Sequence, residues 1–381
     1  MSLTVAKVRE QLSDIVTSSQ FLGFDDQLKL YVRFRGVLDD ILELLDNPVG
    51  PDVIEMLKVF IETIVDENVS LVISRQILTD FNSKVLIEMN NTPCKSLAFF
   101  MLDKMCQRSV SFEEQISNTR LHLSTIYEKE KNFKDAVIML IANPFESGQK
   151  LRSVNYKFAT LIRIARLYLE DNSPLQAELY INRASILQSE DESLQMAYKL
   201  THASVLEYRH KFIEAAHKFN ELSLSSKLTE NERMASLTRA IVCSILSPAG
   251  DRRFKMLTTL YNDERCQTLI NFSILKKLYL CRMIKPDEVD QIETMLLPYQ
   301  KAKTKNNTYL LAEAMFEHNT LSISKLYKNI KIESLASLLK VDPYKAEIIA
   351  ARMISEERMK GSIDQIEGFI HFQCKSLSSI D

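Results

Sequence analysis

Apolar residues recur at three- and four-residue spacing along most of the chain, which is the period of an amphipathic helix. In the first third, one such stripe runs through 53–64 and a second through 73–86. Their members are Val53, Met56, Leu57, Phe60, Ile61 and Ile64, then Ile73, Ile77, Leu78, Phe81, Val85 and Leu86. Helix starts are predicted at Thr92-Pro93 and Ser173-Pro174, because Thr and Ser cap helices and Pro suits the first helical position.

The middle third repeats one pattern. Tyr127, Tyr168 and Tyr208 each end an apolar helical stretch, 41 and 40 residues apart. A polar turn follows each tyrosine, and then a second helix with small residues: Ala136, Ala177, and Ala215 with Ala216. Small residues let two helices approach, and such pairs must stack to bury their apolar faces. We therefore expect an irregular solenoid of helix pairs like tetratricopeptide or HEAT repeats.

The C-terminal segment has a different pattern. It predicts a short helix over 332–339, a second over 343–359 that begins at Asp342-Pro343, and a β-hairpin over 363–372. Glu367-Gly368 is the expected tight turn. This order is that of a winged helix, the one place where we expect strands. An open strand edge of the hairpin would attract a strand from another protein.

The composition agrees with an all-α fold. The 381 residues include only 7 glycines, 9 prolines and no tryptophan, whereas strand-rich proteins need Gly and Pro at their corners. The net charge of -2 argues against a nucleic-acid-binding protein, which normally carries a basic surplus. In the second helix of the winged helix, the charges cancel. It carries three cations, Lys345, Arg352 and Arg358, and three anions, Glu347, Glu356 and Glu357.

The six cysteines show no CxxC spacing, so we expect neither a disulfide framework nor a thiolate zinc site. A reducing compartment, the cytoplasm or nucleus, is the expected location. There is no apolar leader and no run of 18 apolar residues, so we expect no membrane partner.

Motifs of catalysis are missing from the sequence: there is no GxGxxG, Walker A, HExxH or GxSxG. No two histidines stand two residues apart, so the HxH pair of a zinc isopeptidase is missing as well. His210 and His217 are seven residues apart without a suitably spaced carboxylate, which is a weak zinc signal. We expect no catalytic residue, cofactor or metal.

Several segments resemble the PCI-domain subunits of the COP9 signalosome, and in particular its subunit 4 family. They are IARLYLEDNSPLQAELYINRAS at 164–185, FIEAAHKFNELS at 212–223, the YNDERC run at 261–266, EHNTLSISKLYKNI at 317–330 and IDQIEGFIHF at 363–372. The resemblance implies four parts: a helical-repeat arm (1–195), the helical part of a PCI domain (196–317), its winged helix (318–374) and a tail (375–381).

What the resemblance implies is a non-catalytic scaffold and substrate-sensing subunit of the complex that removes NEDD8 from cullin-RING ubiquitin ligases. Its partners would be other PCI and MPN subunits, with the cullin-RING ligase as substrate and no nucleic acid. The winged-helix edge would supply the interface, and an insertion loop would supply a further contact. The residues of the edge are Ser362, Ile363, Gln365, Ile366, Phe369, His371 and Phe372; those of the loop are Lys301, Lys303 and Lys305.

Other interpretations remain open at this point. A PCI subunit of the proteasome lid or a free-standing helical-repeat adaptor would share the architecture, and a DNA-binding winged helix or a hydrolase is a more distant alternative. The resemblance also implies a long C-terminal helix after the wing, whereas 374–381 (CKSLSSID) has no helical stripe. We therefore expect weaker incorporation into a complex than for a chain with that helix.

Overall fold

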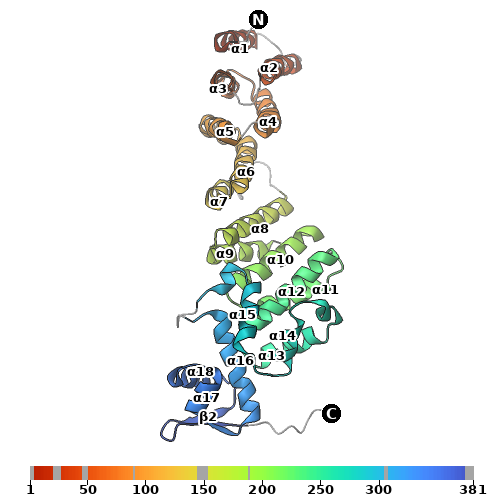
Figure 1. Cartoon of the computed structure of the whole chain (residues 1–381). Coiled ribbons are helices and arrows are strands. Elements are labelled where there is room, and N and C mark those ends of the chain that lie inside the picture. The colour runs from red at the N-terminus through yellow and green to blue at the C-terminus, as the bar shows by residue number, and fades with distance from the viewer. Residues whose placement is uncertain are drawn as a thin grey trace. The chain divides into compact units, whose positions relative to one another are not determined.

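The structure is a computed structural model that describes residues 4–19, 27–44, 50–88, 91–143, 153–187, 189–303 and 308–373. Within these ranges the chain is almost entirely helical, with one small sheet near the C-terminus (Figure 1). It divides into two compact units, Met1–Asp171 and Asn172–Asp381. The expected all-α fold with strands confined to the C-terminal segment is confirmed.

The first unit consists of helices that follow one another in a stack (Figure 1). They are α1 (Val5–Ser19), α2 (Gln27–Leu42), α3 (Pro51–Val65), α4 (Leu71–Glu88), α5 (Asn91–Cys106), α6 (Glu113–Lys129), α7 (Phe133–Ile141) and α8 (Val154–Glu170). The two predicted stripes, from Val53 to Ile64 and from Ile73 to Val85, are buried faces of α3 and α4. The side chain of Leu86 lies outside the described part of the structure. Their phenylalanines Phe60 and Phe81 stack with ring centroids 6.4 Å apart, and both are almost fully buried.

The second unit begins with the helical region and ends with the winged helix. Its helices are α9 (Pro174–Ile186), α10 (Glu192–Tyr208), α11 (Phe212–Leu224), α12 (Glu230–Leu246), α13 (Asp251–Tyr261), α14 (Phe272–Tyr279), α15 (Pro286–Met295), α16 (Leu310–Leu326), α17 (Ile332–Leu339) and α18 (Pro343–Ser355), with 3-10 turns η2 (Glu264–Thr268) and η3 (Pro298–Lys301). The strands are β1 (Asn329–Lys331), β2 (Gly361–Asp364) and β3 (Phe369–Phe372).

The turns of the predicted repeat share one backbone conformation. Lys131, Asn172 and His210, which follow the three tyrosine-ending helices, all have left-handed φ values of 54° to 61°. At two of them the next amide reaches back to close the helix: Asn132 N donates to Tyr127 O and Lys211 N to Leu206 O, both at 2.9 Å. This is the Schellman ending, which usually takes glycine. The small residues of the following helices are fully buried, as expected (Ala136, Ala177, Ala215 and Ala216).

The winged helix agrees with the predicted order but differs in two boundaries. α17 spans the predicted residues, and the Asp342 side chain caps α18 by accepting from Tyr344 N at 3.1 Å. α18 ends at Ser355, four residues before the predicted end, because Glu357 turns left-handed (φ 57°) and Arg358 N donates to Met353 O. The hairpin turn spans 365–368, since Asp364 and Phe369 are the last paired residues.

Candidate protein-interaction site

The sheet of the winged helix has the order β1-β3-β2, with both pairs antiparallel. Phe372 N donates to Lys328 O and Ile332 N to Gly368 O on the β1 side, whereas Gln373 N donates to Lys360 O on the β2 side. In an antiparallel ladder, successive residues alternate between inward and outward backbone groups. The amide and carbonyl groups of Gly361 and Ile363 therefore point away from β3, along the outer edge of β2.

This topology corrects the expectation of a free-standing hairpin with one open edge along its strands. β3 is the central strand, paired on one side by β1 and on the other by β2. The predicted interface residues Phe369, His371 and Phe372 therefore have no open backbone edge. Ser362 and Ile363 lie in β2, which borders only β3 among the described strands. β1 was missed because three residues, Asn329-Ile330-Lys331, are too few to establish an alternating pattern.

The side chains of β3 point alternately to the core and to the surface. Ile370 and Phe372 are buried with Ile330, Leu335 and Met353 in the core of the winged helix. Phe372 is thus a core residue and not a surface contact. Phe369 and His371 lie on the opposite face, where their rings stack at 6.2 Å.

The hairpin turn presents an exposed apolar residue on an ordered support. Ile366 is 99% exposed. Asp364 Oδ1 accepts from Ile366 N at 2.9 Å and from Glu367 N at 3.1 Å, which fixes the turn. Gln365 Nε2 donates to Glu347 Oε1 on α18 at 2.6 Å. Gln365 and Ile366 therefore lie at the tip of the wing, beside the β2 edge.

Gly361 sets how closely β2 approaches the centre of the sheet. A Cβ atom at this position would lie 2.5 Å from the carbonyl oxygen of His371. Real Cβ atoms do not approach a backbone oxygen so closely, so only glycine fits this place in the strand.

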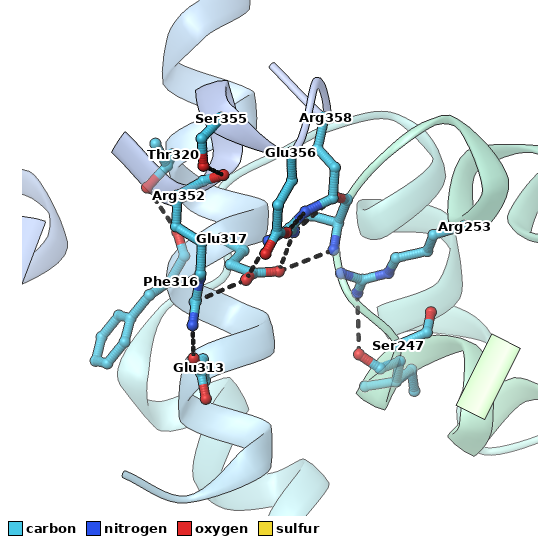
Figure 2. A network of polar contacts seen from close by, with 12 residues as sticks. Ser247, Arg253, Glu313, Phe316, Glu317, Thr320, Arg352, Ser355, Glu356 and Arg358 are labelled. Atoms are coloured by element: carbon cyan, nitrogen blue, oxygen red, sulfur yellow. Dashed lines mark hydrogen bonds and ion pairs between the residues drawn. The ribbon is translucent and has the colours of Figure 1, made fainter. Parts of the chain in front are cut away.

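A buried ionic network fixes the winged helix to the helical region of the same unit (Figure 2). Glu317 on α16 is 4% exposed, and both of its carboxylate oxygens are used. Oε1 accepts from Arg352 Nη2 at 2.9 Å and from Arg358 Nη2 at 2.8 Å. Oε2 accepts from Arg358 Nη1 at 2.6 Å and from the amide of Ala249 at 3.0 Å. A buried carboxylate requires such complete pairing.

From the sequence, the arginines of this network are only charges that cancel on the helix predicted over 343–359. Arg352 also pairs with Glu313, and Arg358 Nε pairs with Glu356 Oε2 at 2.7 Å. The third cation of the segment, Lys345, lies 5.0 Å from the ring centroid of Phe316. All three cations therefore contact residues of their own unit. No local sequence pattern predicts this arrangement, because Glu317 and Arg358 are 41 residues apart.

The base of the predicted insertion loop is anchored in the helical region. Tyr299 in η3 stacks on Tyr208 with ring centroids 3.8 Å apart, and Gln300 Nε2 donates to the buried Glu207 Oε1 at 2.5 Å. Lys301 is exposed at the end of η3. Lys303 forms an isolated bridge with Tyr309, and its Nζ lies 5.2 Å from that ring. Lys305 lies outside the described residues.

The histidines do not gather around a common point. His210 lies in the turn before α11 and stacks on Phe212 at 5.5 Å, so it does not share a helix face with His217. Among the residues that the structure describes, no three His, Cys, Asp or Glu side chains are placed to hold a metal ion. None of the described helices is long and apolar enough to cross a membrane.

Most of the chain matches known protein families. The family model "PSMD12/CSN4, N-terminal" matches residues 36–231, and the "PCI domain" model matches residues 298–373, which include the winged helix. The COP9 signalosome complex subunit 4 of Drosophila melanogaster is 46% identical over 378 residues, which cover 98% of this chain and 90% of the relative. The chain belongs to the COP9 signalosome subunit 4 family.

The same family is represented by relatives from distant organisms. The COP9 signalosome complex subunit 4 of Arabidopsis thaliana is 38% identical, with 95% of this chain and 91% of the relative covered. That of Dictyostelium discoideum is 40% identical, with 90% and 85% covered. The resemblance found in the sequence is thereby confirmed, and β2, α18 and the Glu317 network all belong to the PCI domain or border it.

Proposed function

We propose that this member of the COP9 signalosome subunit 4 family is a non-catalytic scaffold and substrate-sensing subunit. Its place would be in a COP9 signalosome in the cytoplasm and nucleus. The complex would contain other PCI subunits and MPN subunits, one of which would carry the isopeptidase chemistry. Its substrate would be a cullin-RING ligase bearing NEDD8. The names of the relatives and the PCI domain support this role.

The observation that carries the proposal is the outer edge of β2. The backbone groups of Gly361 and Ile363 point outward there, and β2 borders only β3 among the described strands. An exposed strand edge binds a strand of another protein through main-chain hydrogen bonds. The exposed Ile366 at the wing tip adds apolar surface beside that edge. We propose that a neighbouring PCI subunit docks at this place.

The positive charges on α18 and directly after it favour a protein partner over DNA. Lys345, Arg352 and Arg358 contact residues of their own unit, so they do not form a row of cations for phosphates.

The test is reconstitution with the other subunits of the complex. Ile363→Pro removes the outward amide of β2, which an edge strand tolerates within its own sheet. We expect this variant to lose about fivefold in affinity for the neighbouring subunit, since it removes one edge hydrogen bond and each contributes about 1 kcal/mol. Ile363→Val is the matched control and should bind as the wild type does.

Two outcomes would contradict the proposal. The first is full-strength assembly by an Ile363→Pro protein whose circular dichroism and melting temperature match those of the wild type. The second is the absence of COP9 signalosome subunits when a tagged chain is purified from native extract and its partners are identified by mass spectrometry. Recovery of proteasome-lid subunits would favour a lid subunit, and recovery of the chain by itself would favour a free-standing adaptor.

A further inference from the structure

A lysine and a cysteine meet where α16 passes the turn after α14. Lys325 Nζ lies 2.8 Å from Cys281 Sγ, although the residues are 44 positions apart. Lys325 is in the last turn of α16, and Cys281 directly follows Leu280 at the end of α14. Lys325 is exposed and Cys281 is half-buried, so small oxidants in solution reach both atoms. The function proposed above does not use this pair.

The two atoms are held together by contacts on both sides. The ammonium of Lys325 also lies 5.4 Å from the ring centroid of Phe254, which favours this position of the side chain. Cys281 has a left-handed φ of 49°, and the turn is closed by a bond from Arg282 N to Lys277 O at 2.9 Å. The hydrogen-bonded backbone of this turn therefore fixes the position of the thiol.

Side chains of α16 form hydrogen bonds to the turn that follows Cys281. His318 Nε2 donates to Arg282 O at 2.9 Å. Asn319 accepts from Ile284 N at 2.9 Å and donates to Ile284 O at 3.0 Å. His318 and Lys325 are seven residues apart and so lie on one face of the helix. These bonds fix the distance between amine and thiol, and fixed proximity accelerates a reaction between two groups.

We propose that Cys281 and Lys325 form a covalent nitrogen–oxygen–sulfur bridge when the protein meets dioxygen or a peroxide. In the reaction, the neutral amine loses one hydrogen and the thiol loses its hydrogen. One oxygen atom of dioxygen becomes bonded to both Nζ and Sγ, and the other leaves as water. The amine and the thiol each give two electrons, and these four electrons reduce the dioxygen. With hydrogen peroxide, two molecules react and three waters form.

The bridge links two regions of the second unit. α16 leads within two residues into β1 of the winged helix, whereas α14 belongs to the helical region. The oxidised form thus has a covalent tie at the root of the winged helix, and it has lost the positive charge of Lys325. Restoring both residues takes four electrons and releases the bridging oxygen as water. Two molecules of a dithiol supply these electrons, beginning with attack on the sulfur, which is at the sulfenic level that thiols reduce.

The test is mass spectrometry of the full chain after treatment with dilute hydrogen peroxide. Insertion of one oxygen with loss of two hydrogens adds about 14 Da, and digestion should give one linked peptide containing both residues. Dithiothreitol should remove the mass increase and separate the peptides. The link should be absent in Cys281→Ser and Lys325→Arg, and retained in Cys106→Ser, which removes an exposed thiol on another helix.

Melting temperature provides a second measurement that does not depend on mass. Oxidation should raise the melting temperature of the wild type and leave that of Lys325→Arg unchanged, since a covalent tie restricts the unfolded chain. The proposal is overturned if the wild type takes up only whole oxygen atoms on Cys281 while the Lys325 peptide stays unlinked. A link that persists in Cys281→Ser would overturn it equally.

Discussion

His318 is a buried histidine whose surroundings favour the neutral ring. It is 4% exposed, and its Nε2 faces the carbonyl oxygen of Arg282 at 2.9 Å. Burial, together with the positive charge of Arg253, lowers the pKa of His318 to about 4. A carbonyl only accepts, so Nε2 carries the proton of the neutral ring.

This histidine should make the second unit sensitive to acid. The unfolded chain takes up a proton near pH 6.5, whereas the folded ring takes it up only near pH 4. His318 therefore leaves the free energy of unfolding unchanged above pH 6.5. As the pH drops toward 4, it lowers that free energy by up to about 3 kcal/mol. Urea unfolding of the wild type and of His318→Gln at pH 7.5 and pH 4.5 measures this. Between these two pH values the variant should lose about 2–3 kcal/mol less than the wild type, and equal losses would contradict the argument.

The burial of Arg253 could not be predicted from the sequence. It is almost fully buried, burial lowers its pKa to about 10, and Nη2 donates to Ile245 O at 3.1 Å. In the sequence it looks like its neighbour Arg252, which is exposed. Helical spacing predicts that apolar residues are buried, but it does not predict which arginine is buried with them, because that depends on partners from distant segments.

At the scale of elements, the helices were predictable because their signals are local. The stripes of α3 and α4, the cap at Asp342 and the proline at α18 all act within a few residues. β1 was not predictable, since its only inward residue is Ile330 and its partner strand is about forty residues away. The same missing strand explains why β3 was mistaken for an edge.

The approach of β2 to β3 gives a test at this scale. Gly361→Ala places a methyl group 2.5 Å from the carbonyl oxygen of His371, so β2 must move away from β3. We expect the substitution to cost about 1–3 kcal/mol, measured by denaturant unfolding. Gly36→Ala is the matched control, because a Cβ there meets no atom within 4 Å and alanine favours the helix. Equal effects of the two substitutions would argue against the close approach.

At the scale of the whole molecule, the chain has separate cores. One cluster extends from Val8 to Ile126 in the first unit, and two further clusters lie within the second unit. A unit with its own core is expected to fold by itself. The arrangement as a helical array with a winged helix followed from local patterns. The ionic network could not be predicted, because its partners are 35 to 109 residues apart.

A fragment of residues 172–381 tests this independence. We expect it to show helical circular dichroism and a single cooperative thermal transition. A shorter fragment, 210–381, lacks α10, whose Ala203 and Leu206 belong to the core of the helical region. It should melt at a clearly lower temperature. A gradual, non-cooperative transition for 172–381 would mean that the second unit depends on the first.

The bond from Arg358 Nη1 to the carbonyl oxygen of Ala249 joins residues 109 positions apart. During synthesis, α12 and α16 leave the ribosome well before α18 and Arg358. Until then, Glu317 has neither of its arginine partners and must stay hydrated. Segments rich in local contacts fold early, whereas contacts between distant positions form late. We therefore expect the wing to dock onto the helical region late in folding, after the helices that it contacts have formed.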